Sequence, residues 1–172
     1  MLQLISIVMV IYSFFLIKTS IPNLPRMIPT HFNAAGLSDG WGSPDTLWVL
    51  LGAQALTCCV FLFLPYLSLR SPGTVHFGRR RLSDFPPSQR ERMIALLNQM
   101  WGYLNVLMNL FFVVMLRQII HAAAQPIPRI YPHWPMVLLV GGVVGIMLYY
   151  LGKFRRAAKA REGDGPSEGP AS

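Results

Sequence analysis

Residues 46–69 read TLWVLLGAQALTCCVFLFLPYLSL, twenty-four consecutive positions without a charged side chain. An α-helix rises about 1.5 Å per residue, so about 20 apolar residues cross the hydrocarbon core of a bilayer. Three further uncharged stretches occur at residues 1–17, 93–116 and 130–152. This pattern predicts a small multi-pass membrane protein with four spans rather than a soluble domain.

The composition agrees with that prediction. Of 172 residues, 53% are hydrophobic and 13% are charged, which is about half the charged share of an average soluble domain. The 15 Lys and Arg residues outnumber the 7 Asp and Glu residues and give a net charge of +8. Nucleic-acid-binding proteins spread such a charge through a polar chain, whereas here apolar stretches separate it, so no nucleic-acid partner is expected. Cys58 and Cys59 both lie inside an apolar stretch, which predicts neither a disulfide framework nor a cysteine metal site.

Prolines and capping residues set the expected ends of the helices. Pro22 follows the first apolar stretch and stops its helix. Ser43, Pro44 and Asp45 offer a hydroxyl cap, a proline at the first helical position and a carboxylate in the first turn. A capping-box pattern, starting at Ser88, precedes the third stretch. The four predicted helices cover about residues 2–20, 44–69, 89–123 and 134–152.

These boundaries define the predicted domain organisation. Residues 1–152 are predicted to form an all-α integral membrane four-helix bundle, with an ordered outer loop between the first two helices. Residues 153–161 are basic, and residues 162–172 are rich in Gly, Pro and Ser, a composition that cannot bury enough apolar surface to fold. Residues 153–172 are therefore predicted to be a cytoplasmic tail whose end is disordered.

The distribution of Lys and Arg predicts the orientation. Four spans place both termini on the same side of the membrane. Eleven basic residues lie on that side: Arg70, Arg79, Arg80, Arg81, Arg90, Arg92, Lys153, Arg155, Arg156, Lys159 and Arg161. Four lie on the other side: Lys18, Arg26, Arg117 and Arg129. Because cytoplasmic loops carry the basic excess, we expect both termini in the cytoplasm.

The connection between the first two helices has the most distinctive sequence. Residues 21–45 read IPNLPRMIPTHFNAAGLSDGWGSPD, in which three prolines stiffen an extended approach. Residues 33–36 are suited to a turn, and Asp39-Gly40 is a strong tight-turn pair. Trp41 suits a membrane interface. We therefore expect an ordered outer loop that caps the bundle.

The pattern LP-x-x-IP-T-HFN-x-x-G-x-x-DGWGS, within residues 22–48, resembles a membrane family known as domain of unknown function 1648. That family is found alone or at the front of SdpI-like immunity proteins. The residues on the family pattern are Pro25, Pro29, His31, Asn33, Gly36, Asp39, Gly40 and Gly42. The chain departs from the family at Pro44, where a lysine is common, and SdpI-like proteins continue into further spans.

The resemblance implies a protein of the bacterial cytoplasmic membrane with a protective, sensory or regulatory role. It also makes the outer motif a candidate binding surface. The residues of that surface are Pro29, His31, Asn33, Gly36, Asp39, Gly40, Trp41 and Gly42.

Histidines and carboxylates on the outer side allow another interpretation, because both are zinc ligands. The candidates are His31, Asp39, Asp45, His121 and His133. The hypothesis that follows is a metal-dependent enzyme on the outer face. No close-spaced pair such as H-x-x-x-H supports it. We therefore favour a structural role in which His31 and Asn33 hydrogen-bond the turn backbone, with no metal and no cofactor.

Polar and small residues recur along the third helix, at spacings of four, three and four. They are Asn98, Gly102, Asn105 and Asn109. Polar groups at membrane depth usually face protein rather than lipid. We favour helix packing, with Gln54 as a candidate partner, over a polar substrate or ion path, because no acidic residue accompanies the stripe. On the fourth helix, Gly141 and Gly145 form a small-xxx-small pair that also predicts close packing.

The sequence lacks the common catalytic motifs. It contains no nucleotide-binding glycine loop, no G-x-S-x-G and no paired carboxylates at membrane depth. We expect a non-enzymatic membrane protein whose partners are the lipid bilayer and other membrane proteins. The alternative is an accessory subunit of a larger membrane complex, with the asparagine stripe and the Gly141/Gly145 face as docking surfaces.

Overall fold

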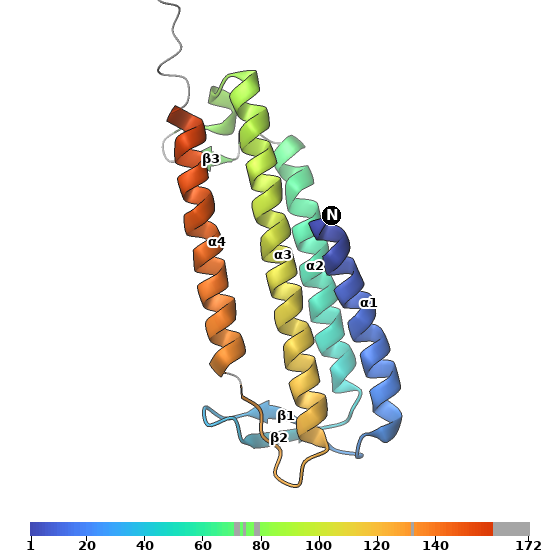
Figure 1. The fold of residues 1–172 in the computed structure, drawn as a ribbon. Coiled ribbons are helices and arrows are strands. Elements are labelled where there is room, and N and C mark those ends of the chain that lie inside the picture. Colours follow the sequence, from blue (N-terminus) through green and yellow to red (C-terminus); the bar gives the residue numbers. More distant parts are fainter. Residues whose placement is uncertain (71–72, 74, 78–79, 132, 160–172) are drawn as a thin grey trace, which may run out of the picture.

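The computed structural model describes residues 1–70, 73, 75–77, 80–131 and 133–159, and this part of the chain is mostly helical. The four long helices are α1 (Leu2–Ser20), α2 (Thr46–Arg70), α3 (Pro87–Ala123) and α4 (His133–Lys159). Each is long and apolar enough to cross a membrane, as the apolar stretches predict. The helices run alternately in opposite directions (Figure 1). The start of α1 and the end of α4 both point away from a β-hairpin at the other end of the molecule.

Helix α3 is the centre of the arrangement. It packs against α1, α2 and α4, and α1 also packs against α2. Figure 1 shows α4 on the other side of α3 from α1 and α2, and the described residues give α4 no comparable interface with either of them. The bundle is therefore open: three helices form one packed unit, and α4 is attached along α3.

Two helices begin at positions that differ from the prediction. α2 begins at Thr46 rather than at about residue 44, because the Thr46 N–H donates to the Ser43 carbonyl, at 3.1 Å, in a tighter turn ahead of the helix. α3 begins at Pro87, with Pro86 in the N-cap position. The prediction that Ser88 caps α3 is wrong, because Ser88 already lies inside the helix.

Helix α4 extends beyond its predicted end. The boundary at residue 152 is wrong, since the helix continues to Lys159. Two residues in the additional part, Phe154 and Ala157, are buried. The basic segment that follows the apolar run therefore begins as helix. The segment predicted to be disordered, residues 162–172, lies outside the described residues.

The connection between α1 and α2 contains an antiparallel hairpin of β1 (Ile28–Phe32) and β2 (Ser38–Gly42). It follows a 3₁₀ turn at Ile21–Asn23. At the opposite end, β3 (His76–Phe77) and β4 (Arg80–Arg81) form a shorter antiparallel pair between α2 and α3. The all-α prediction therefore holds for the helical part, while the connection predicted as a loop is a small sheet.

Apolar clusters hold the helices together at both ends. Near the hairpin, Ile17, Ile28, Leu47 and Leu116 join α1, β1, α2 and α3. The clusters at the other end consist of Leu82, Phe85 and Met93, and of Leu97, Tyr150 and Phe154. The second of these joins α3 to α4. Polar side chains occupy the interior between the two ends.

Candidate functional site

The hairpin carries all the candidate binding residues of the outer motif. Its register pairs Ile28 with Gly42, Pro29 with Trp41, His31 with Gly40 and Phe32 with Ser38, with irregularities on both sides of His31. The turn is organised by Asn33, whose side-chain oxygen accepts the backbone N–H groups of Ala35 at 2.9 Å and Leu37 at 3.1 Å. Gly36 has a positive φ of 76°, which residues with a side chain rarely adopt. The turn predicted at residues 33–36 is confirmed.

The tight turn predicted at Asp39-Gly40 is wrong, because both residues lie inside β2. Gly40 is instead required by a close approach between the strands. A Cβ atom at position 40 would lie 2.7 Å from Cβ of His31, closer than real Cβ atoms come. At Gly42, a Cβ atom would lie 3.0 Å from Cγ2 of Thr30. The glycines of the motif therefore let the two strands meet.

The hairpin is fastened to the rest of the molecule on two sides. The Ser38 N–H donates to the Pro128 carbonyl at 3.3 Å, and the Ile130 N–H donates to the Gly36 carbonyl at 2.9 Å. Both bonds join the hairpin to the connection between α3 and α4. Ile28 is fully buried in the cluster that joins β1 to three helices. Backbone bonds and core contacts together fix the position of the hairpin.

The exposed side chains of the hairpin include those of His31, Asp39 and Trp41. Nδ1 of His31 and Oδ1 of Asp39 are hydrogen-bonded, and the two side chains are 74% and 44% exposed. Trp41 is 52% exposed. Pro29, in contrast, is fully buried. The hairpin thus presents an imidazole, a carboxylate and an indole on a backbone that its buried and glycine residues hold in place.

The role predicted for Asn33 is confirmed, whereas that for His31 is wrong. His31 pairs with the Asp39 side chain rather than with the turn backbone. The described residues contain no group of three His, Cys, Asp or Glu residues that could hold a metal ion. The His133 side chain lies outside this description. The exposed pair of His31 and Asp39 supplies two of the four ligands that a typical structural zinc site requires.

A second polar feature lies in the interior, where α1 and α2 pack on α3. Asn105 and Asn109 are fully buried. The Asn105 amide donates to Oε1 of Gln3 on α1, at 2.6 Å, and lies 3.9 Å from Sγ of Cys58 on α2. The Asn109 amide donates to the side-chain oxygen of Asn105 at 2.8 Å. The bond from Asn105 joins α1 to α3, with Gln3 as the partner instead of the predicted Gln54, and the bond from Asn109 lies within α3.

Several buried polar atoms near this network have no hydrogen-bond partner among the described residues. They are Oγ of Ser6, Oγ of Ser13, Nε2 of Gln54, Oδ1 of Asn98 and Oδ1 of Asn109. Helix α1 contributes Gln3, Ser6 and Ser13 to this polar interior, and none of the three was predicted as a site residue. Their spacing of three and seven residues places them on one helix face, and this periodicity would have identified them.

The glycines of α3 and α4 differ in their surroundings. At Gly102 a Cβ atom would lie 3.1 Å from Cδ1 of Leu2, and at Gly142 it would lie 2.8 Å from Cδ2 of Leu107. At Gly141 and Gly145, nothing lies within 4 Å. The prediction that these two glycines pack closely is wrong within this chain, because α4 is rotated so that Gly142 meets α3.

Comparison with known proteins supports the family resemblance over one segment. Residues 4–57 match the family model of a domain of unknown function, DUF1648. The match includes most of α1, the whole hairpin and the first half of α2. It covers 54 of the 172 residues, just under a third of the chain. No curated protein and no solved structure matches the chain.

Proposed function

We propose that this chain is a non-enzymatic multi-pass protein of the bacterial cytoplasmic membrane, whose hairpin binds an extracytoplasmic molecule. Its role is protective, sensory or regulatory, as in SdpI-like proteins. The four long apolar helices support residence in lipid, and the DUF1648 match supports the family resemblance. The excess of eleven over four basic residues, at the end that holds both termini, supports a cytoplasmic location of that end.

The binding role is supported by one observation: the backbone of the hairpin is held in place while several of its side chains are exposed. The hairpin is held by the buried Ile28 and by backbone bonds to the connection between α3 and α4, yet His31, Asp39 and Trp41 are exposed. Groups that are already held in place lose little conformational entropy when a ligand binds. Tryptophan is also enriched among the residues that dominate binding energy at protein interfaces. A peptide or protein ligand fits this surface best.

Photo-crosslinking in intact cells tests the binding role. A photoreactive amino acid replaces Trp41, and Ile127 serves as the matched control because it is 73% exposed in the other connection at the same end. We expect a discrete adduct at position 41, absent at position 127 and weakened by His31→Ala. Identical products at both positions, or no product at position 41, contradict the binding role.

Membrane residence is tested separately by extraction. We expect the chain to sediment with membranes and to need detergent for release, because many large apolar side chains on the helices are exposed. A monodisperse preparation in buffer without detergent contradicts the proposal as a whole.

An accessory subunit of a larger membrane complex is the second candidate. The observation that favours it is the open face of α4, where Gly141 and Gly145 have no neighbour within 4 Å. Small residues let a second helix approach closely in lipid. Extraction in a gentle detergent is expected to retain a stoichiometric partner that Gly141→Leu releases. A chain that always purifies alone contradicts this candidate.

A further inference from the structure

A cavity opens between α3 and α4 at the end away from the hairpin. Its volume is about 360 Å³, and its walls include Gln99 and Tyr103 from α3 and Gly145, Tyr149 and Lys153 from α4. Gly145 leaves room for the cavity, because nothing lies within 4 Å of a Cβ atom at that position. Tyr103 and Tyr149 are about half exposed, so the cavity is open to the surroundings of the helices.

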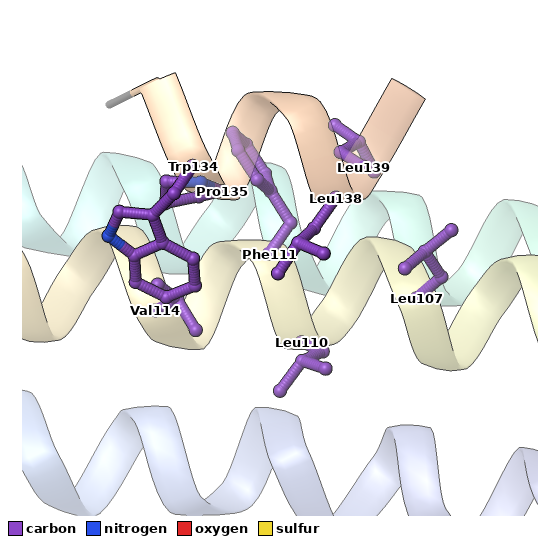
Figure 2. Close-up of a pocket in the computed structure, with 8 residues that line it drawn as sticks. All are labelled: Leu107, Leu110, Phe111, Val114, Trp134, Pro135, Leu138 and Leu139. Atoms are coloured by element: carbon purple, nitrogen blue, oxygen red, sulfur yellow. The ribbon is translucent and has the colours of Figure 1, made fainter. Parts of the chain in front are cut away.

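A second, smaller cavity lies between the same two helices near the hairpin. Its volume is about 50 Å³, and Figure 2 shows its apolar walls, formed by side chains such as Leu110 and Val114 from α3 and Trp134 and Leu138 from α4. The α3 residues that line the two cavities are Gln99, Tyr103, Leu107, Leu110, Phe111 and Val114. They recur at intervals of three or four residues, which places them on one helix face. The two cavities therefore lie along the same face of α3, with the close contact between Leu107 and Gly142 between them.

The two cavities differ in the chemistry of the side chains that line them. In the larger cavity, Nζ of Lys153 lies 4.7 Å from the centre of the Tyr149 ring and 5.7 Å from that of the Tyr150 ring. The hydroxyl of Tyr150 lies 3.5 Å from Oε1 of Gln99. Within the described residues, no carboxylate forms an ion pair with Lys153. The larger cavity therefore has an uncompensated cation and tyrosine hydroxyls, and the smaller cavity has aliphatic and aromatic side chains.

We propose that the larger, polar cavity binds one anionic phospholipid of the cytoplasmic leaflet. The phosphate lies at Lys153 and Tyr149, and an acyl chain runs past Gly145 toward Leu107. The inference rests on the proposed membrane residence and orientation. Lys and Tyr are suited to the level of the head groups, where their polar tips meet phosphate and their apolar parts meet acyl chains.

The charge of Lys153 explains the preference for an anionic lipid. A basic side chain near the surface contributes about 1 kcal/mol to the attraction of anionic head groups, which corresponds to about fivefold in affinity. The open space beside Gly145 explains why the lipid occupies a defined position, because a larger side chain at residue 145 would block the path of the acyl chain.

The test uses the full chain, purified in a mild detergent and exposed to an equimolar mixture of phosphatidylglycerol and phosphatidylcholine. Mass spectrometry of the intact complex then counts the bound lipids. We expect one retained phosphatidylglycerol. Lys153→Gln lowers its retention about fivefold, Gly145→Leu lowers it at least as much, and Lys153→Arg preserves it.

Two control variants are matched to these changes. Gly152→Leu alters another open glycine of α4 that does not line the cavity, and Arg156→Gln removes an exposed charge one turn beyond Lys153. Gly152→Leu is expected to retain the lipid as the parent chain does, and Arg156→Gln is expected to lose less of it than Lys153→Gln, because Arg156 does not line the cavity. Equal retention by all variants overturns the proposal, as does equal retention of the two lipids or a protein subunit found at Gly145 in place of lipid. A chain that needs detergent but retains no lipid overturns this inference alone and leaves membrane residence standing.

Discussion

The residues of the outer motif divide by what they contribute. Pro29 is buried, and Gly36 and Gly40 occupy positions that a side chain would strain or obstruct, so they determine the shape of the hairpin. His31 and Asp39 are exposed and paired with each other, so they determine what the surface offers to a ligand. Substitutions in the first set are expected to change stability, and substitutions in the second set to change binding with little effect on stability.

The first prediction concerns the shape of the hairpin. Gly40→Ala places a methyl group against Cβ of His31, at 2.7 Å, and that atom is attached directly to the backbone and cannot move aside. We expect a loss of about 1 to 3 kcal/mol in the free energy of unfolding, as is typical of overpacking. Thermal unfolding of the protein in detergent measures this loss.

The same substitution at Gly52 is the control, because a Cβ atom there meets nothing within 4 Å. Gly52→Ala lies inside α2 and is expected to be neutral or to stabilise the protein by up to about 1 kcal/mol. Equal unfolding temperatures for the two variants would show that the strands do not approach as closely as described.

The second prediction concerns the interior polar network. Asn105→Leu removes the donor to Gln3 and leaves the Asn109 amide with the Asn105 backbone carbonyl as its acceptor. We expect a cost of roughly 0.6 to 2 kcal/mol for the hydrogen bond lost between α1 and α3. Ser6→Ala is the control in the same interface, since the Ser6 hydroxyl is buried without a partner among the described residues and its removal leaves no new unpaired group. Unfolding by titration with a denaturing detergent compares the two, and a larger loss for Ser6→Ala contradicts the network.

The inward direction of the asparagine stripe could be predicted from sequence, but its partner could not. The spacing of Asn98, Asn105 and Asn109 defines a face, and the cost of exposing amides to lipid turns that face inward. Which residue of a neighbouring helix it meets depends on the rotation and relative height of the two helices. Those quantities are set by packing along the whole interface, which is why Gln3 rather than Gln54 accepts the Asn105 hydrogen bond.

At the scale of elements, the helices follow from the sequence far better than the hairpin does. A run of about 20 apolar residues needs no knowledge of the rest of the chain to be predicted as a helix. β1, IPTHF, carries a proline among its strand formers, and β2, SDGWG, has Trp41 as its one strong strand former. Neither strand has a regular alternation of apolar and polar residues, and their pairing is irregular beside His31. Asp39-Gly40 has the local preference of a turn, yet cross-strand pairing and the bonds to the connection between α3 and α4 override it.

The end of α4 was mispredicted for a different reason. The apolar run stops at Gly152, and hydrophobicity alone therefore predicts that the helix ends there. The residues that follow, KFRRAAK, are mostly good helix formers, and Phe154 packs with Leu97 and Tyr150. The helix therefore continues, with its contacts to α3, beyond the point where hydrophobicity falls.

The third prediction concerns the interface between α3 and α4. Gly142→Leu drives a side chain into Leu107, whereas Gly141→Leu adds the same side chain in open space one position earlier. Both changes raise helix propensity equally, so the difference between them isolates the contact. We expect the free energy of unfolding of Gly142→Leu to be about 1 to 3 kcal/mol lower than that of Gly141→Leu. Titration with a denaturing detergent measures both values. The reverse order would mean that α4 presents its other face to α3.

At the scale of the whole molecule, the open arrangement has a physical cause that composition does not reveal. Lipid tails are as apolar as leucine, so burying leucine against another helix gains little over leaving it in lipid. Neighbours are chosen by close packing and by polar contacts. The buried polar groups lie on α1, α2 and α3, at Ser6, Gln54 and Asn105, and these three helices form the packed unit. Helix α4 brings no such group to that interior and lies alongside α3 alone.

The last prediction concerns the orientation of the molecule, which decides whether the hairpin can meet an extracytoplasmic ligand. Ala34→Cys and Ser83→Cys place single thiols at exposed positions at opposite ends of the molecule, in the hairpin turn and before α3. In intact cells, a membrane-impermeant maleimide is expected to label position 34 and not position 83, because the arginine-rich end is retained in the cytoplasm. Permeabilised cells are expected to show labelling at both. The parent chain controls for Cys58 and Cys59, which lie inside α2. Labelling at position 83 alone would show the opposite orientation, with the lipid-binding cavity in the outer leaflet and the hairpin in the cytoplasm.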